Sequence, residues 1–402
     1  MSLRVDCWRE LDCQLEHHIA TNRLPGVACT VIDQGERVYE RALGWQDVDQ
    51  HRPMALDTIC RIESMTKVVT CTAAMLLCEE QRLDLNAPVA RYVPAFGDSK
   101  VSEVDELGHE RLAVPNRPML IRDLLCHTAG LSYGSSSDPV DERYRAMFRD
   151  LDLPGTVDSE SVVSLQMFAS RLAEIPLAYH PGSGWRYSMA TDLLGHVVER
   201  VSDLSLTDFM DERLFGPLGM DDTGFRVCDH QLERFGPLYR ADGDGGWRTV
   251  DRPDESKWRR SPLHFVEAGG GLVSTVSDFA RFLAMLLASG ESKTKGLLQP
   301  ESVAWMVENH VPANVLPIQM GSSRVLAGCC FGAGFSVLLD AGQSLLSGSP
   351  GVCSWAGAAS TGYWFDPHDD LAVVQMAQVV PNEMAYLDLM APVQAAINQC
   401  SH

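Results

Sequence analysis

Strand-like runs at both ends of the chain, with helical patterns between them, constrain the fold more than any other feature. Residues 27–33 and 36–43 predict a β-hairpin near the N-terminus, because β-branched and apolar residues flank a Gln-Gly turn. Three more strand-like runs stand near the C-terminus, at 331–339, 361–366 and 371–378. Because elements must bury their apolar faces against one another, this order predicts one sheet built from both ends of the chain, with a helical insertion.

The helical patterns set the expected domain boundaries. Apolar residues at helical spacing predict an amphipathic helix over residues 6–21, and a last helix is predicted over residues 385–398. Between the two sets of strands the chain is mainly helical, with long connections. We therefore expect a discontinuous α/β (α+β) sheet domain formed by residues 1–82 and 266–402, a mainly helical domain over residues 83–265, and an active site in the cleft between them.

Composition excludes some classes of partner. The 402 residues carry 33 basic and 54 acidic side chains, a formal net charge of −21, and so acidic a chain is not suited to nucleic acid or to an anionic membrane surface. No stretch approaches the length of a membrane-spanning apolar segment, so no membrane partner is expected. Twelve scattered cysteines without a C-x-x-C pair, and an N-terminus without an apolar signal segment, predict a reduced protein in the cytoplasm.

One turn of predicted helix carries the strongest signal for chemistry. Ser64 and Lys67 are three residues apart, so on a helix they share one face and their side chains are neighbours. Ser64 stands at the predicted helix start, where free backbone N–H groups favour developing negative charge. A serine beside a basic lysine, at a position that stabilises an oxyanion, is suited to acyl transfer. The alternative is that Ser64 is a helix N-cap and Lys67 a solvated side chain.

Two further segments add to this pair. Tyr187 lies in a connection rich in glycine and proline, just before a predicted helix, where its side chain can be presented to a cleft. Residues 354–361 are mostly small and stand at the start of a predicted strand, where Gly357 permits close backbone approach to a ligand. The alternatives are a packing role for Tyr187 and a tight beginning to the strand for the second segment.

Taken in order, these segments resemble the serine β-lactamase and penicillin-binding-protein superfamily, whose three signatures are S-x-x-K, Y-x-N and K-T-G. The resemblance covers most of the chain, from about Val27 to Pro381, and stretches at residues 125–134, 192–196 and 269–275 look like the class C branch. The resemblance implies a β-lactamase-like fold, with a central antiparallel sheet flanked by N- and C-terminal helices and an added all-helical domain.

Two of the signatures differ from the superfamily pattern. Met189 stands where the asparagine of Y-x-N is expected. Trp355, Ala356 and Gly357 stand where K-T-G is expected, so the cation that faces a β-lactam carboxylate is missing. Both differences look like the family VIII carboxylesterases, which keep the serine, lysine and tyrosine but often carry W-x-G. The resemblance therefore implies a serine carboxylesterase for short to medium acyl esters, with slow hydrolysis of some cephalosporins as a side activity.

The resemblance also implies a role for each of these residues. Ser64 attacks the ester carbonyl while Lys67 and Tyr187 act as general base and acid; a lysine base requires a pKa lowered by burial or by a nearby positive charge. The backbone N–H groups of Ser64 and Ala358 hold the oxyanion. The residues expected to contact the substrate are Tyr133, Trp355, Ala356, Gly357 and Met189. No metal and no cofactor are implied, and the expected partner is a small-molecule ester.

Several alternatives remain open at this point. The other candidate functions are a β-lactamase, a D-aminopeptidase or DD-peptidase, an acyltransferase, and a catalytically silent relative that serves as a binding or scaffold protein. Ser132 lies in a G-x-S-x-G pattern, but the strand and helix of a nucleophile elbow are not predicted around it. His127 lies in a turn that ends a helix, so a structural role is expected. Residues 133–179 and 234–265 are expected to shape specificity, and the oligomeric state is left open.

Overall fold

The structure is a computed structural model, and it describes residues 5–21, 23–153, 155, 159, 161–291, 297–321, 324–344 and 348–381. The last helix predicted from the sequence, over residues 385–398, lies outside these described residues. Within them, no helix is long and apolar enough to cross a membrane.

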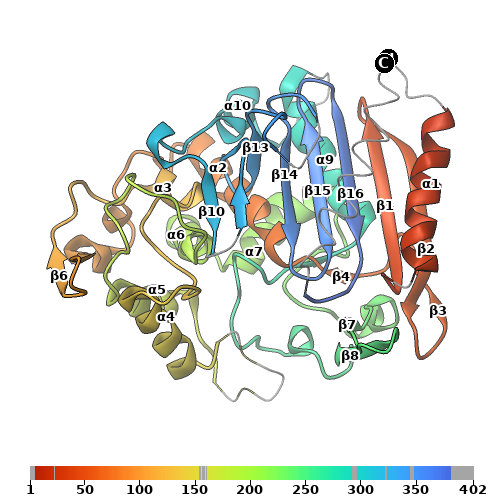
Figure 1. The fold of residues 1–402 in the computed structure, drawn as a ribbon, viewed down its shortest axis with the longest axis horizontal. Helices are drawn as coiled ribbons and strands as arrows, with labels where there is room; N and C mark the ends of the chain where they lie inside the picture. Colours follow the sequence, from red (N-terminus) through yellow and green to blue (C-terminus); the bar gives the residue numbers. More distant parts are fainter. Residues whose placement is uncertain are drawn as a thin grey trace.

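The central feature is an eight-stranded sheet that joins the two ends of the chain (Figure 1). The strand order is β12-β13-β14-β15-β16-β1-β2-β3, and neighbouring strands are antiparallel. β1 pairs with β16 from Ala28 opposite Met376 to Asp33 opposite Leu371, which confirms the prediction of one sheet from both ends. The strands are β1 (Gly26–Asp33), β2 (Glu36–Asp47), β3 (Arg52–Pro53), β12 (Cys329–Phe331), β13 (Ser336–Leu338), β14 (Cys353–Gly357), β15 (Thr361–Asp366) and β16 (Leu371–Met376).

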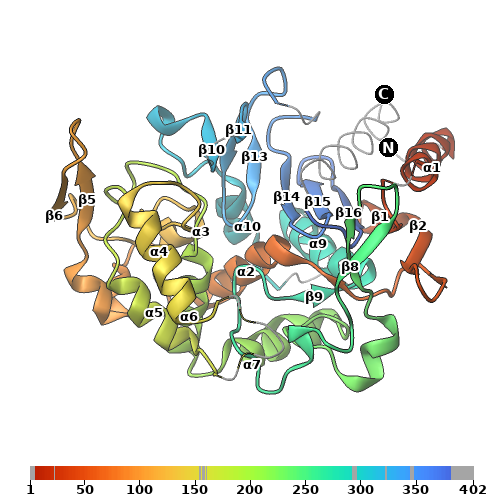
Figure 2. The same cartoon turned by 60° about the horizontal axis from the view of Figure 1, so that its bottom comes forward.

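Helices cover the sheet and form a second group beyond it (Figure 2). They are α1 (Val5–Ala20), α2 (Thr66–Glu79), α3 (Ile121–Leu125), α4 (Pro139–Asp150), α5 (Leu165–Ala173), α6 (Ala190–Ser202), α7 (Leu206–Met210), α8 (Gly216–Leu218), α9 (Val276–Glu291) and α10 (Pro300–Val307). α2 lies between the sheet and the group formed by α3 to α6, and it packs against α6. Residues 66–77 of α2 are all buried, as expected of a helix that is covered on every side.

Alternating residues of the strands cover the two faces of the sheet, as the two-residue period of a strand requires. In β1, Val27 and Val31 pack on one face with Leu15 of α1. Ala28 and Ile32 belong to the larger core on the other face, where α9 packs against β1 and β16. Because both faces are covered, β1 and β16 are buried almost throughout their length.

Local structure differs from one predicted strand. Of the run 331–339, Phe331 ends β12 and residues 336–338 form β13, because Gly334, with a φ of +87°, turns the chain between them. In the helical segment, α5 begins at Leu165, because the Ser164 side chain accepts a backbone N–H of the first turn and caps the helix there.

Two short hairpins stand within the mainly helical segment 83–265. They are β5 (Val101–Val104) with β6 (Glu110–Ala113), and β7 (Leu238–Ala241) with β8 (Trp247–Asp251). In the turn of the second hairpin, the Asp242 carboxylate accepts the N–H groups of Asp244 at 2.9 Å and Gly246 at 2.8 Å. The Asp242 side chain therefore stabilises this turn. The division of the chain into two domains stays a prediction.

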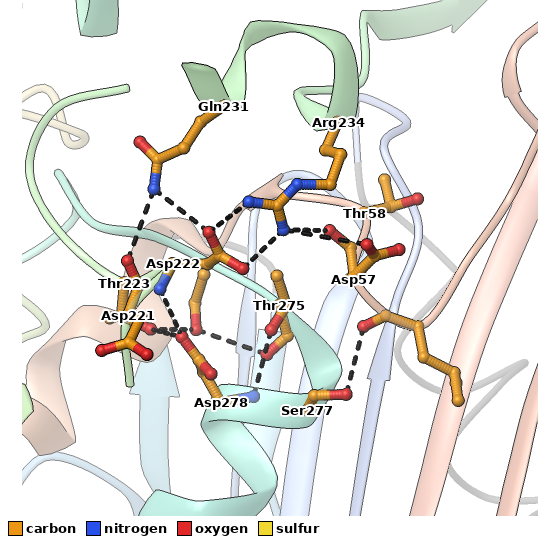
Figure 3. A network of polar contacts seen from close by, with 12 residues as sticks. Asp57, Thr58, Asp221, Asp222, Thr223, Gln231, Arg234, Thr275, Ser277 and Asp278 are labelled. Atoms are coloured by element: carbon orange, nitrogen blue, oxygen red, sulfur yellow. Dashed lines mark hydrogen bonds and ion pairs between the residues drawn. The ribbon is translucent and has the colours of Figure 1, made fainter. Parts of the chain in front are cut away.

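A polar network attaches the start of α9 to the segment 221–234 (Figure 3). The Asp278 carboxylate accepts the backbone N–H of Asp222 at 2.8 Å and the Thr223 hydroxyl at 3.1 Å, and Arg234 forms bonds of 2.5 and 2.6 Å to the Asp222 carboxylate. The Thr223 hydroxyl also lies 2.7 Å from that of Ser274, in β9 (Val273–Ser274). β9 pairs with β4 (Cys60–Arg61), so the network supports the strand that leads directly to Ser64.

Candidate active site

Ser64 lies in a single 3₁₀ turn, Glu63–Met65, between β4 and α2. Glu63 has a φ of +48°, in the left-handed region, and this sharp bend turns the chain from the strand into the helix. No side chain caps the start of the turn or of α2, so the structure does not use Ser64 as an N-cap. The half-buried hydroxyl instead accepts a hydrogen bond from Lys67 Nζ at 3.2 Å.

Lys67 is fully buried and is not a solvated side chain. Besides its bond to Ser64, its ammonium donates to the carbonyl oxygen of Gly269 at 2.6 Å. Its Nζ lies 4.7 Å from the ring centre of Tyr187 and 5.5 Å from that of Tyr133. The structure therefore brings the predicted serine and tyrosine, both half-buried, together around the buried Lys67, with Tyr133 beside them.

The charge state of Lys67 differs from the one that a lysine base requires. Burial by itself lowers the pKa of Lys67, but negative charge at Tyr133 and Tyr187, the hydrogen bond with Tyr187 and the Asp192 carboxylate together raise it above its ordinary value. A lysine base requires a lowered pKa, and Lys67 does not have one. Lys67 is held as an ammonium that donates hydrogen bonds.

Tyr187 is also in contact with the central sheet. It lies in the loop before α6, and its hydroxyl accepts a hydrogen bond from Trp355 Nε1, on β14, at 3.2 Å. The two ring centres are 5.3 Å apart. Trp355 therefore places a neutral donor where K-T-G proteins carry a lysine ammonium.

An aromatic group surrounds this pair, and two of its members were not expected from the sequence. Phe331 lies 5.1 Å from Trp355 and 5.3 Å from Trp185, measured between ring centres, and Tyr133 lies 5.3 Å from Tyr187. Trp185 stands two residues before Tyr187, so the alternation of aromatic residues in that loop was an available signal. Phe331 lies at the end of β12, and its sequence context gave no such signal, because its position depends on strand pairing.

The remaining predicted substrate residues lie around the end of β14 and the start of α6. Met189 is buried directly before α6. A Cβ atom added at Gly357 would lie 2.3 Å from the carbonyl oxygen of Ile62, so this glycine lets the strand approach the Ser64 turn closely. Ala356 is half-buried and Ala358 is exposed at the end of the strand. The end of β14, with Ala358 next to it, thus packs against the turn that holds Ser64.

The two competing residues, His127 and Ser132, have other contacts. His127 is fully buried, its Nδ1 lies 3.0 Å from the Ser188 hydroxyl, and burial with the nearby Lys67 charge lowers its pKa well below the ordinary value. Ser132 is also fully buried, and its hydroxyl accepts the N–H of Gly134 at 3.3 Å. The structure describes no strand directly before Ser132, so the nucleophile-elbow geometry is not formed there.

Asp192 is the residue whose role sequence reasoning missed. It lies in the first turn of α6, is 1% exposed, and accepts the backbone N–H of Gly269 through Oδ1 at 2.9 Å. Burial raises the pKa of this carboxyl to about 7. An acidic residue among the apolar residues of α6 was the available signal, but its partner is 77 positions away in the sequence.

The arrangement is suited to acyl transfer through a serine. It combines the Ser64 hydroxyl, bonded to the Lys67 ammonium, with the Tyr187 oxygen, which is bonded to Lys67 and Trp355. The end of β14 lies close to them, and its backbone can face an oxyanion. Within the part of the chain that the structure describes, no group of three or more His, Cys, Asp or Glu side chains could hold a metal ion.

The chain is similar to known proteins along most of its length. The family model described as Beta-lactamase matches residues 11–396. Protein Rv1367c of Mycobacterium tuberculosis is 35% identical over 363 residues, covering 88% of this chain and 86% of that protein. Esterase EstB of Burkholderia gladioli is 30% identical over 412 residues, covering 96% and 93%. Among solved structures, EstCE1, a hydrolase with promiscuous acyltransferase activity, has a TM-score of 0.78 at 25% identity, covering 97% of this chain and 98% of that chain.

Proposed function

The chain belongs to the Beta-lactamase family, and from this premise we propose that it is a serine carboxylesterase that hydrolyses short to medium acyl esters through an acyl-enzyme on Ser64. The superfamily of serine hydrolases that share this fold includes esterase and acyltransferase relatives. The observation that carries the proposal is the buried contact of Ser64 Oγ with Lys67 Nζ at 3.2 Å, beside a Tyr187 oxygen that accepts from Trp355 at 3.2 Å.

Tyr187 is the proposed acceptor of the Ser64 proton. The raised pKa of Lys67 keeps its amine protonated, so this side chain donates a hydrogen bond to Ser64 and does not take its proton. The Lys67 ammonium and the Trp355 N–H both stabilise negative charge on the Tyr187 oxygen. In this mechanism the base is the Tyr187 phenolate, and Lys67 is its positive neighbour.

The reaction then follows the acyl-enzyme route. Ser64 Oγ forms a bond to the ester carbonyl carbon while its proton moves to the Tyr187 oxygen, and the backbone N–H groups of Ser64 and Ala358 hold the oxyanion. When the tetrahedral intermediate collapses, the C–O bond to the alcohol breaks and Tyr187 returns the proton to the leaving oxygen. Water, deprotonated by Tyr187 in the same way, attacks the acyl carbonyl carbon. The bond from that carbon to Ser64 Oγ then breaks, the acid leaves, and Tyr187 returns the proton to Ser64 Oγ.

The side chains around Tyr187 and Trp355 favour uncharged substrates. Trp355 supplies one N–H and no positive charge, and its neighbours Tyr133, Tyr187 and Phe331 are aromatic. A substrate carboxylate therefore gains no ion pair where K-T-G proteins offer a lysine. This supports a family VIII type of carboxylesterase, with slow turnover of cephalosporins compared with esters.

Labelling tests the proposed nucleophile directly. Hydrolysis of p-nitrophenyl butyrate is expected, and a fluorophosphonate probe is expected to inactivate the enzyme with one label per chain. Peptide mass spectrometry should find that label on Ser64 and none on Ser132. Label on Ser132, or an active enzyme that takes no label, would contradict the proposal. The ratio of ester to nitrocefin turnover separates an esterase from a β-lactamase.

Trp355→Phe is expected to lower kcat for p-nitrophenyl butyrate about 10-fold or more, because the ring stays while the hydrogen bond to the charged Tyr187 oxygen is lost. The matched control is Trp185→Phe, which removes an indole N–H that has no hydrogen-bond partner among the described residues of the same aromatic group. The control should keep most of its kcat. Equal losses in both variants would assign the effect to packing and not to the N–H of Trp355.

Acyl transfer to an alcohol is the second candidate activity. It is favoured by the similarity to EstCE1, whose description includes promiscuous acyltransferase activity. The same acyl-enzyme is resolved by an alcohol when the alcohol replaces water at Tyr187. Added 1-butanol is expected to give butyl butyrate from p-nitrophenyl butyrate, measured by gas chromatography. Hydrolysis without a transfer product would contradict the acyltransferase activity, and the esterase proposal would stand.

A further inference from the structure

The peptide group of Gly269 joins two ionisable side chains next to Ser64. Its N–H donates to Asp192 Oδ1 at 2.9 Å, and its carbonyl oxygen accepts from Lys67 Nζ at 2.6 Å. A Cβ atom added at Gly269 would lie 2.8 Å from Asp192 Oδ2 and 3.4 Å from Lys67 Nζ. The second carboxylate oxygen and the ammonium therefore approach the same point beside this glycine, where a side chain would separate them.

The Asp192 carboxylate is not explained by the stability of the fold. Its Oδ2 is buried and has no hydrogen-bond partner among the described residues. Burying a charge with one oxygen unsatisfied opposes folding, and an amide could keep the Oδ1 bond to Gly269 without that charge. A carboxyl at this place is explained by the negative charge that it presents to Lys67.

We propose that Asp192 is a positioning residue, whose buried carboxylate, acting through the Gly269 peptide, orients Lys67 toward Ser64 and keeps the lysine protonated. The inference rests on the proposed function, in which the Lys67 ammonium stabilises the Tyr187 oxyanion. An ammonium without solvent contact loses its proton readily unless negative charge lies close to it. Asp192 supplies that charge and does not take part in bond making.

Other ionisable groups around the pair have different contacts. Tyr133 and Tyr187 face Lys67 with their rings, and Glu267 forms an ion pair of 3.1 Å with Lys257. The remaining groups whose charges act on Lys67 are Glu63, Cys71 and His127. Burial raises the pKa of the thiol and lowers that of the imidazole, so both are neutral near pH 7. The bond to Gly269 distinguishes Asp192 from these groups.

Nuclear magnetic resonance of lysine side chains tests the proposal without any substrate. The chain has five lysines, Lys67, Lys100, Lys257, Lys293 and Lys295, so ¹³Cε signals can be assigned by single substitutions. In the wild type, Lys67 is expected to titrate above the ordinary lysine pKa of 10.5. In Asp192→Asn its titration is expected to move to lower pH by about 1 unit or more. An unchanged Lys67 titration, or a wild-type Lys67 that titrates below the ordinary lysine pKa, would overturn the proposal.

Kinetics distinguish positioning from a merely structural role. In Asp192→Asn, kcat for p-nitrophenyl butyrate is expected to fall about 10-fold with little change in KM, and the alkaline limb of the kcat profile should move to lower pH together with the Lys67 titration. Thr191→Val is the control, because it removes a buried hydroxyl from the same turn of α6. It should keep the wild-type pH profile. A fall in kcat with the alkaline limb unmoved would overturn the proposal, whereas failure of Ser64 labelling would overturn the proposed function alone.

Thermal unfolding gives a third, independent readout. The pKa of Asp192 in the fold is about 7, above its ordinary value of 3.8, so the folded state binds the proton more tightly than the unfolded chain. This group therefore stabilises the wild type fully below about pH 4 and loses that contribution as the pH rises through 7. Asp192→Asn removes this pH dependence, so the wild type should lose Tm relative to the variant between pH 4 and pH 8. A Tm difference between the two proteins that does not change over this range would overturn the proposal.

Discussion

Replacing Ser64 by alanine is expected to lower kcat for p-nitrophenyl butyrate by at least about 1000-fold, because the atom that forms the acyl bond is lost. The fold is expected to survive. The 3₁₀ turn around Ser64 has no side-chain cap, and Lys67 keeps its 2.6 Å bond to the Gly269 carbonyl when the hydroxyl is removed. The substitution therefore separates chemistry from stability.

The matched control for this variant is Ser132→Ala. Ser132 is the serine of the competing G-x-S-x-G pattern, and its hydroxyl contacts Gly134 and Arg186. The control should retain most of the wild-type kcat, and both variants should unfold within a few degrees of the wild type in calorimetry. A Ser64→Ala enzyme with a near wild-type rate, or a Ser132→Ala enzyme that is inactive but folded, would show that the nucleophile is misassigned.

Gly357→Ala is expected to have the second largest effect, on both activity and stability. The added Cβ would lie 2.3 Å from the Ile62 carbonyl oxygen and 2.3 Å from Thr361 Oγ1, contacts too short for a folded protein to keep. The end of β14 must then move away from the Ser64 turn. Overpacking of this kind costs about 1–3 kcal/mol of unfolding free energy, and displacing the proposed Ala358 donor lowers kcat about 100-fold or more.

The control is Gly97→Ala, in the turn Pro94–Asp98, where an added Cβ would lie at an ordinary contact distance of 3.9 Å from the Ala90 Cβ. It should keep the Tm and most of the kcat of the wild type. Urea unfolding and p-nitrophenyl butyrate kinetics measure the two effects separately. A Gly357→Ala enzyme with unchanged kcat would show that the approach of β14 to Ser64 is not needed for the reaction.

Contacts close in sequence were predictable, and those that depend on distant partners were not. The three-residue spacing of Ser64 and Lys67 alone indicated their contact, which the structure places at 3.2 Å. The protonation of Lys67 was not predictable, because it depends on a balance between burial and charges from other segments. Asp192 was missed for the same reason, since its partner Gly269 lies on a loop after the helical segment.

The elements of the fold also differ in how far the local sequence predicts them. The β-branched, aromatic and apolar residues of 27–33 and 361–366 were enough to place strands there, and the order of elements was enough to place them in one sheet. The hairpin of β7 with β8 was not predicted, because short strands with exposed faces have weak periodicity. The helix α4 was also missed, although its amphipathic pattern and the cap at Asp138 were available signals. The predicted strand 331–339 is interrupted by a local turn at Gly334, so that of this run Phe331 ends β12 and residues 336–338 form β13.

The pairing of β1 with β16 also determines when this protein can fold during its synthesis. β1 ends at Asp33, but its partner strand ends at Met376, so most of the chain must leave the ribosome before this pair can form. At about 5–20 residues per second, the delay is roughly 20–70 s. Throughout that time one edge of the N-terminal hairpin has no partner strand, and such an edge favours pairing between chains. We therefore expect the nascent chain to depend on chaperones and to aggregate when it is expressed rapidly.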